Sequence, residues 1–483
     1  MGDSHISRSF FWSFLEQGGA KVVQLIVQVV LARLLAPEAF GLLAVLLVIT
    51  QVADSIAQSG FGMALIQKVD ATDRSFDTSF WLSIGVAAAL YAVIFPCAPL
   101  LASFYGMPDL VATLRVLALA VLFNAANSIQ RSYMQKRMDF RGLFRVSFAA
   151  TVGSGVVGVA AAVVGWGVWA LVAQVIAQSV FTCIAMCLLV PWRPHFRFCG
   201  SEARELYGYG WKVCITGILN VFYTGVSELI LGKACSAAEL GYYSQGRKYP
   251  AAAIGVMTNG IANVLLPAFS KAKGDLEYLH ELIHQGLRLG TFVVAPVSLC
   301  AAVIAEPIVV LLLGENWLPC VSVFALACAG NSILMLQLVN LRAFMALGRS
   351  DLYLALQIAK VSLGILGVGG TALLTHDIYA TAWAAFFVGI IGITLIDLHP
   401  SSRVIGYSRM RQIADILPVL LLAAMAALGS WMVTWLHLSC AIELLLQVVA
   451  YALLYVGGAK LLHFSELDDA LEKLRPMFRR IKR

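Results

Sequence analysis

The sequence predicts an all-α polytopic membrane protein with about fourteen transmembrane helices. Hydrophobic residues make up 60% of the 483 residues and charged residues only 13%, too little charge to cover a water-soluble protein of this size. Apolar runs of about 20 residues recur along the chain, and each is long enough to cross a bilayer. Lys and Arg gather in every second connection between these runs, as expected for a polytopic protein.

The apolar runs place the helices in chain order. The first six begin near residues 12, 40, 80, 110, 144 and 166. The next six begin near residues 209, 239, 286, 320, 353 and 378, and the last two begin near residues 413 and 440. Because the longest polar connections hold only about 15 to 20 residues, we expect no catalytic domain between the helices.

The positive charges predict the orientation of the helices. Connections after even-numbered helices, together with the two terminal segments, hold 27 of the 34 Lys and Arg residues. Connections after odd-numbered helices, such as residues 165–167 and 375–379, hold almost none. The positive-inside rule therefore places both termini in the cytoplasm. The net charge of +7 is then a consequence of topology, and no nucleic-acid partner is expected.

A weak internal repeat divides the chain into halves. Residues 31–43 align without gaps to residues 231–243, an offset of 200. Six helices per half give the two halves the same orientation, so we expect a pseudo-two-fold axis along the membrane normal. The aligned pairs include Leu31 with Leu231, Arg33 with Lys233, and Gly41 with Gly241.

The repeat also predicts the domain organisation. We expect one six-helix lobe over residues 1–200 and a second over residues 201–400. Two further helices follow over residues 401–464, and residues 465–483 form a basic cytoplasmic tail that can contact anionic lipid headgroups. Two lobes with this symmetry are expected to enclose a cleft, which is a transporter architecture.

Polar side chains follow one face of several predicted helices. In the first helix Gln17, Lys21, Gln24 and Gln28 recur at helical spacing. An ionisable group within a bilayer costs roughly 2.5–3.5 kcal/mol, so such faces should line a water-filled cavity or form dry hydrogen bonds between helices. The candidate cavity residues are Lys21, Gln24, Gln28, Arg33, Gln58, Asn220, Arg247, Lys248 and Asn259.

Some of these side chains have a second interpretation. Arg33 lies near a helix end, where a long basic side chain can snorkel to the membrane interface. Two acidic residues are candidates for binding a coupling ion: Asp54, about fourteen residues into the second helix and near the membrane midplane, and Glu228 in the seventh helix. A structural salt bridge to Arg247 or Lys248 would explain Glu228 about as well.

Two motifs resemble binding signatures, but their context argues against both. Residues 280–284, HELIH, fit the HExxH zinc signature. Its two histidines precede the ninth helix, whereas the possible third ligand Glu306 lies roughly 30 Å further along that helix. Residues 153–158 fit GxGxxG, but no strand precedes them. We therefore expect no metal and no cofactor.

Several segments resemble the bacterial Wzx-type polysaccharide flippases of the multidrug/oligosaccharidyl-lipid/polysaccharide (MOP) exporter superfamily. The similarity runs in order from about residue 10 to 350 and is closest to the exopolysaccharide or colanic-acid branch. The last third matches only in hydropathy. The segments include LARLLAPEAFGLLA, GFGMALIQ, FWLSIG, QRSYMQKRMDFRGL, GVWALVAQ, LLPAFSKAKGD and LLLGENWLP.

The resemblance implies a MOP exporter fold and a flippase, a secondary transporter and not an enzyme. Its substrate would be an undecaprenyl-pyrophosphate-linked oligosaccharide, moved across the bacterial cytoplasmic (inner) membrane for exopolysaccharide or lipopolysaccharide biosynthesis. Transport would proceed by alternating access, coupled to an ion gradient. Expected partners are this substrate, membrane lipids and a polysaccharide polymerase or export machinery.

Two other functions remain open at this stage. A multidrug exporter, or an exporter of another lipid-linked precursor, would share the fold. A membrane glycosyltransferase or polymerase is the more distant alternative, since it would need an extended polar catalytic loop that this chain lacks.

Overall fold

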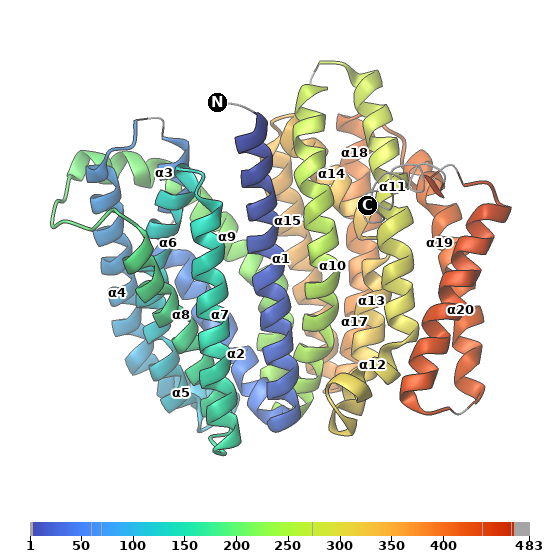
Figure 1. The fold of residues 1–483 in the computed structure, drawn as a ribbon, viewed down its shortest axis with the longest axis horizontal. Helices are drawn as coiled ribbons and strands as arrows, with labels where there is room; N and C mark the ends of the chain where they lie inside the picture. Colours follow the sequence, from blue (N-terminus) through green and yellow to red (C-terminus); the bar gives the residue numbers. More distant parts are fainter. Residues whose placement is uncertain are drawn as a thin grey trace. The chain divides into compact units, whose positions relative to one another are not determined.

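The computed structural model describes residues 3–58, 60–68, 70–272, 274–436, 438–464 and 466–467. For residues 3–18, 209, 212, 223 and 350 it describes the backbone alone. Every regular element in these ranges is a helix (Figure 1). The predicted fold class is therefore confirmed for the part of the chain that the structure describes.

Each of the predicted transmembrane helices has a counterpart in the structure. Eleven helices are long and apolar enough to cross a membrane, and two bent pairs raise the number to 13. The bent pairs are Val213–Phe222 with Thr224–Ala234, and Glu315–Asn331 with Leu334–Ala346. The remaining counterpart, the first helix, has side chains described only from Gly19 onward. The total of fourteen spans stays a prediction.

The exposed faces of these helices are apolar, which is the pattern expected in lipid. Only 11% of the most apolar 18-residue segment of α4 (Asp73–Tyr105) is buried. Leu188 on α8 (Val168–Leu189) and Leu453 on α20 (Cys440–Leu461) are 78% and 70% exposed. Such continuous apolar surface is unfavourable in water, so these helices are suited to a bilayer.

The described chain forms two compact units. Unit 1 comprises Met1–Ser244 and Ala372–Ile378, and unit 2 comprises Gln245–Thr371 and Tyr379–Arg483. The lobe boundaries at residues 200 and 400 stay predictions. Besides α4 and α8, unit 1 contains α1 (Asp3–Leu34), α2 (Pro37–Gln58), α3 (Phe61–Gln67), α5 (Leu110–Leu117), α6 (Leu119–Lys136), α7 (Phe140–Val163) and α9 (Gly200–Ala234).

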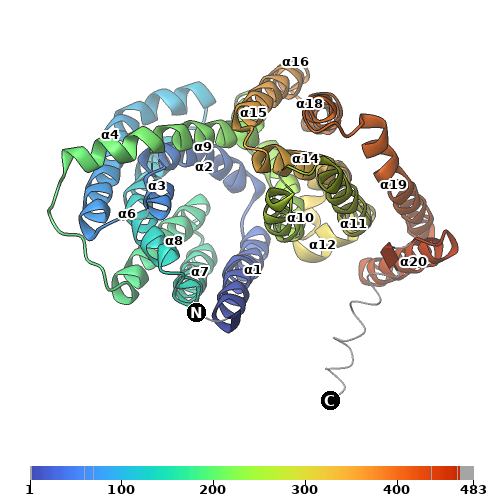
Figure 2. The same ribbon diagram turned by 90° about the horizontal axis from the view of Figure 1, so that it is seen from above.

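Within unit 1, α7 packs against both α1 and α8, α4 packs against α6, and α2 packs against α9 (Figure 2). The starts of two helices are fixed by side-chain caps. Thr72 and Ser75 form a capping box at the start of α4, and Asp139 accepts from the amide of Gly142 at the start of α7. Gly106, in the left-handed conformation, ends α4.

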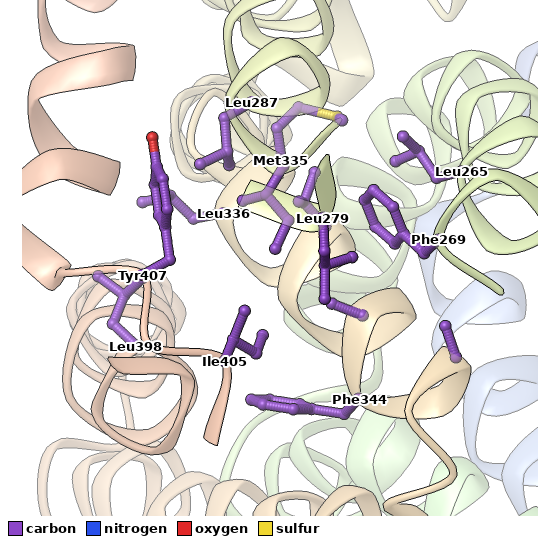
Figure 3. Close-up of a cluster of buried hydrophobic side chains, with 14 of the residues drawn as sticks. Leu265, Phe269, Leu279, Leu287, Met335, Leu336, Phe344, Leu398, Ile405 and Tyr407 are labelled. Atoms are coloured by element: carbon purple, nitrogen blue, oxygen red, sulfur yellow. The ribbon is translucent and has the colours of Figure 1, made fainter. Parts of the chain in front are cut away.

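α10 (Ala237–Lys271) begins in unit 1 and continues into unit 2. In unit 2, α11 (Leu276–Val303) packs against α19 (Arg409–Trp431), and α19 packs against α20 (Figure 1). Figure 3 shows the apolar core of this unit, in which Met335, Leu336 and Phe344 of α14 lie among side chains from α10, α11 and the segment around Tyr407. The helices of unit 2 other than α10 and α20 are α11 (Leu276–Val303), α12 (Ala305–Leu312), η1 (Glu315–Cys320), α13 (Val321–Asn331), α14 (Leu334–Ala346), α15 (Ser350–Gly364), η2 (Ile365–Gly369), α17 (Ile378–Ile391), η3 (Gly392–Asp397), α18 (Leu398–Val404), α19 (Arg409–Trp431) and η4 (Met432–Leu436); α16 (Gly370–Thr375) lies between η2 and α17.

The internal repeat of the sequence is matched by equivalent helix boundaries in the structure. α1 ends at Leu34 and α9 at Ala234, while α2 begins at Pro37 and α10 at Ala237, so both boundaries keep the offset of 200. The two repeats cross closely. A Cβ added to Gly41 would lie 1.8 Å from the carbonyl oxygen of Ala237, and one added to Gly241 would lie 2.1 Å from that of Pro37. Each glycine therefore allows the same close approach to the other repeat.

Candidate functional site

Asp54 on α2 joins this helix to α6. Its Oδ2 accepts a hydrogen bond from Nδ2 of Asn124 at 3.0 Å. Its Oδ1 is buried and has no hydrogen-bond partner among the described residues. Because α2 ends at Gln58, Asp54 lies one turn before the end of this helix, and its predicted depth near the membrane midplane stays a prediction. A buried carboxylate oxygen with spare acceptor capacity is suited to binding a proton or a small cation.

Gln28 lies in a different environment from the other polar residues of α1. Its Nε2 donates to Oε1 of Gln174 on α8 at 3.2 Å, and the two residues are 4% and 5% exposed. Gly158 on α7 makes room for Gln174, because a Cβ there would come within 2.8 Å of the glutamine side chain. Gln28 thus forms the dry interhelical hydrogen bond that the sequence left open as an alternative.

The other candidate cavity residues are more accessible. Lys21 and Gln24 are exposed on α1, and Gln58 at the end of α2 is half-buried. A charged side chain within a membrane span is costly unless it faces water or a polar partner, so an aqueous cavity beside this part of α1 stays a prediction. Of the remaining candidates, Arg33, Asn220 and Asn259 are exposed, and Glu228, Arg247 and Lys248 are half-buried.

Two basic residues near helix ends act as anchors. Lys233 donates from Nζ to the carbonyl of Phe104 and lies 5.0 Å from the centre of the Phe104 ring. Arg115 donates from Nε to the carbonyl of Phe95 at 3.1 Å and lies 4.3 Å above the Phe95 ring. These contacts stabilise a cation beside an aromatic ring. Lys233 is the repeat counterpart of Arg33, for which both interpretations, anchoring and substrate binding, stay predictions.

A salt-bridged cluster connects α9 to the segment between α3 and α4. Lys68 lies 2.9 Å from Glu202 and 2.8 Å from Glu205, and Ser75 donates to the same oxygen of Glu202. The hydrogen bond from Lys68 is the main reason that the pKa of Glu202 is lowered. The bonds to Glu205 and then to Glu202 raise the pKa of Lys68. The cluster therefore ties the start of α9 to the rest of unit 1.

The sequence did not single out Asp397, which the structure pairs with Lys360 in unit 2. Lys360 Nζ lies 3.1 Å from Asp397 Oδ1, and the side chains are 3% and 0% exposed. Lys360 is a cation within an apolar run of the sequence. The corresponding signal for its partner is an aspartate within the apolar segment GITLIDL, residues 392–398.

The HELIH histidines contact the chain near residue 405. His280 Nε2 lies 2.6 Å from the carbonyl oxygen of Ile405, and His284 Nδ1 lies 2.9 Å from Oδ1 of Asp415. Tyr407 donates its hydroxyl proton to Oδ2 of the same aspartate at 2.7 Å. The histidines therefore join α11 to α19 and to the segment before it.

Comparison with known proteins identifies relatives of this sequence. The family described as "Polysaccharide biosynthesis protein" matches residues 30–322. The chain is 23% identical over 329 residues to the succinoglycan biosynthesis transport protein ExoT of Rhizobium meliloti, covering 68% of this chain and 67% of that protein. It is 25% identical over 308 residues to the lipopolysaccharide biosynthesis protein WzxC of Escherichia coli, covering 63% and 62%. The chain thus spans roughly two thirds of the length of these relatives.

Solved structures show the same fold. The structure of the lipid II flippase MurJ in an inward closed conformation superimposes with a TM-score of 0.73 at 12% identity, covering 94% of this chain and 99% of that one. An inward-facing multidrug resistance transporter of the MATE family, in the MOP superfamily, gives a TM-score of 0.62 at 12% identity, covering 84% and 95%. The predicted MOP exporter fold is therefore confirmed.

Proposed function

Because the chain belongs to the polysaccharide biosynthesis protein family, we propose that it is a flippase for a lipid-linked oligosaccharide. The observation that carries this proposal is the family match over residues 30–322 on a fold shared with a lipid II flippase. The substrate would be an undecaprenyl-pyrophosphate-linked repeat unit, moved between leaflets of the bacterial cytoplasmic membrane by alternating access. The chain would be a secondary transporter and not an enzyme.

The chemistry of the candidate residues supports such a substrate. A pyrophosphate group needs cations, and their attraction is stronger in a low-dielectric membrane interior than in water. Lys21, Arg33, Arg247 and Lys248 would supply this charge. The sugars need neutral hydrogen-bonding groups, for which Gln24, Gln58, Asn220 and Asn259 are the candidates. Gln28, which is bonded to Gln174, would hold the helices together instead.

A gradient of ions would drive the transport. Asp54 is the better of the two predicted coupling residues, because its Oδ1 is buried without a hydrogen-bond partner among the described residues. Glu228 is half-buried on α9 and remains the second candidate. A polysaccharide polymerase or export machinery would receive the flipped unit.

Reconstitution in lipid vesicles tests this function. A fluorescent undecaprenyl-pyrophosphate-linked oligosaccharide placed in one leaflet should become accessible in the other only in vesicles that contain the protein. Empty vesicles measure the background rate. A protein that exports cationic drugs from vesicles but does not move the labelled lipid would instead support the multidrug alternative, which the likeness to the MATE-family structure keeps open.

A further inference from the structure

The Lys360–Asp397 pair lies where a charge is costly. Both residues belong to helices that are long and apolar enough to cross a membrane. Lys360 Nζ lies 3.1 Å and 3.3 Å from the two carboxylate oxygens of Asp397, and the side chains are almost completely buried. Ionisable groups within membrane spans are rare and usually have a function. The pair is distinct from Asp54, which belongs to the other unit.

The backbone around the pair departs from regular α-helix. The π-helical segment η3 ends at Asp397, and a second π-helical segment, η2, begins five residues after Lys360. π-Helical turns are rare and occur frequently at functional sites. The position of the carboxylate at the junction of η3 and α18 therefore points to more than helix packing.

A ring of buried polar side chains begins one helical turn from Asp397. Ser401 on α18 donates to Oδ1 of Asn340 on α14, and Asn340 donates to Oε1 of Gln412 on α19 at 2.7 Å. Gln412 in turn donates to Ser401 Oγ at 3.0 Å and to the carbonyl of Tyr407 at 3.2 Å. Ser401, Asn340 and Gln412 are all 0% exposed. We call these three residues the polar ring.

Polar groups continue from the ring to the surface of unit 2. The hydroxyl of Tyr407 donates to Asp415 at 2.7 Å, and Asp415 contacts His284, whose side chain is 41% exposed. Figure 3 shows the apolar side chains of this region, including Leu336 and Leu398, which lie about one helical turn before Asn340 and Ser401. The ring meets Tyr407 at its backbone carbonyl, whereas Asp415 is bonded to the Tyr407 hydroxyl. One helical turn separates the ring from Asp397, so the pair, the ring and the Tyr407–Asp415–His284 contacts are three neighbouring polar groups within an apolar core.

We propose that Lys360 and Asp397 form a proton-binding site and that the polar ring holds water through which protons pass between this site and the end of unit 2 at His284. A proton from water forms an O–H bond with the Asp397 carboxylate, giving a neutral carboxylic acid. Lys360 keeps its ammonium proton, so the charge of the pair changes from zero to plus one. Release returns the same proton to water.

Protonation changes what the pair requires from its surroundings. Protonation removes the counter-charge that Asp397 gives Lys360, which makes the buried ammonium less favourable and favours a rearrangement of the helices. Lys360 and Asp397 interact with each other through their opposite charges and through a hydrogen bond. The other ionisable groups on the elements packed around them are Arg342 on α14, Asp351 and Tyr353 on α15, His399 and Arg403 on α18, and Arg409, Arg411 and Asp415 on α19. The inference rests on the proposed function, for which it names the proton as coupling ion.

Infrared spectroscopy of the purified protein in lipid vesicles tests proton binding without any substrate. The wild-type protein should show a carboxylic-acid C=O band that titrates with pH and is absent from Asp397→Asn. In Lys360→Gln the band should titrate at higher pH, because the carboxylate has lost the cation that favours its charged form. Identical titrations of the wild-type protein and Asp397→Asn would overturn the proposal.

Transport of the labelled lipid-linked oligosaccharide tests coupling. The double variant Lys360→Met/Asp397→Leu should still fold, because apolar side chains of similar size commonly replace a buried ion pair without loss of stability. An imposed proton gradient should accelerate the wild-type protein several-fold and leave the rate of the double variant unchanged. Acceleration of the double variant, or none of the wild-type protein, would overturn the proposal.

The polar ring has its own matched control. Ser401→Ala should reduce the gradient-driven rate several-fold, whereas Ser402→Ala, whose hydroxyl bonds locally to the His399 carbonyl at 3.0 Å, should not. Equal rates for the two variants would contradict the role of the ring. A wild-type protein that shows the Asp397 band but moves no labelled lipid would contradict the proposed function and leave the proton site standing.

Discussion

Asp54 and Gln28 are both polar residues of membrane helices, but their surroundings differ. Gln28 is satisfied by Gln174 in a dry contact, whereas Asp54 keeps one buried oxygen without a hydrogen-bond partner among the described residues. Spacing along a helix cannot distinguish these cases, because it fixes which face a residue occupies and not what packs on that face. The candidate site was therefore predicted as a set of residues, while their individual roles needed contacts from other helices.

We predict that Asp54→Asn weakens gradient-driven transport. The substitution keeps the size of the side chain but removes the group that can change charge, so the driving ion loses one of its binding sites. The ratio of transport rates with and without a gradient should fall, with normal protein levels in the membrane. Asp109→Asn, at an exposed position before α5, is the control. An unchanged ratio for Asp54→Asn would reject its role in coupling.

A second prediction concerns Arg247 and Lys248. Replacing both with Gln should lower polymer export at least about tenfold, because a hydrogen bond to a charged group contributes about 1.5–3 kcal/mol. Protein levels should not change. Arg115→Gln serves as the comparison, since Arg115 is engaged with Phe95. Wild-type export by the double variant would exclude these residues as essential phosphate contacts.

At the scale of the element, the repeated glycines decide how closely helices approach. α2 and α10 begin at positions related by the repeat, and each carries a glycine one turn later that meets the backbone of the other helix. Small residues at helix crossings are the usual means of close packing in membranes. The repeat was visible in the sequence, but the contact between α2 and α10 was not. An alignment shows that two positions are equivalent and does not show that they are close in space.

We predict that Gly41→Ala destabilises the protein by about 1–3 kcal/mol, since its Cβ would overlap the carbonyl of Ala237. Gly255→Ala on α10 should instead be neutral or stabilising, because no atom lies within 4 Å of a Cβ there and alanine is the better helix former. Thermal unfolding of the purified protein in detergent measures both. Equal unfolding temperatures for the two variants would contradict the tight crossing.

The cluster of Lys68 with Glu202 predicts a pH dependence. The pKa of Glu202 is lowered below its ordinary value of 4.5, so its contribution to stability is complete above about pH 4.5 and is lost as the pH falls through the lowered pKa. Glu202→Gln should therefore lower the unfolding temperature at pH 7. Both side chains are partly exposed, so the effect should be about 1 kcal/mol at most. The difference from the wild-type protein should shrink on acidification; a constant difference would reject the ion pair as its cause.

At the scale of the whole molecule, composition and charge predict the membrane topology. We predict that alkaline phosphatase fused after Gly165 is active, because that connection should lie outside the cytoplasm, and that a fusion to the C-terminus is inactive. Residues 468–483 of the predicted tail lie outside the described part of the chain. An active C-terminal fusion would reverse the orientation and require another assignment of the basic connections.

The sequence by itself determined the fold class, the positions of the helices and the membership of the family. These properties depend on local hydrophobicity and on motifs, which are carried by contiguous residues. The tertiary structure decided which polar residues are paired: Gln28 with Gln174, Asp54 with Asn124, and Lys360 with Asp397. Partners so far apart in the chain meet only after the helices pack, because the cost of a buried polar group depends on the neighbour that satisfies it and not on its own position in the sequence.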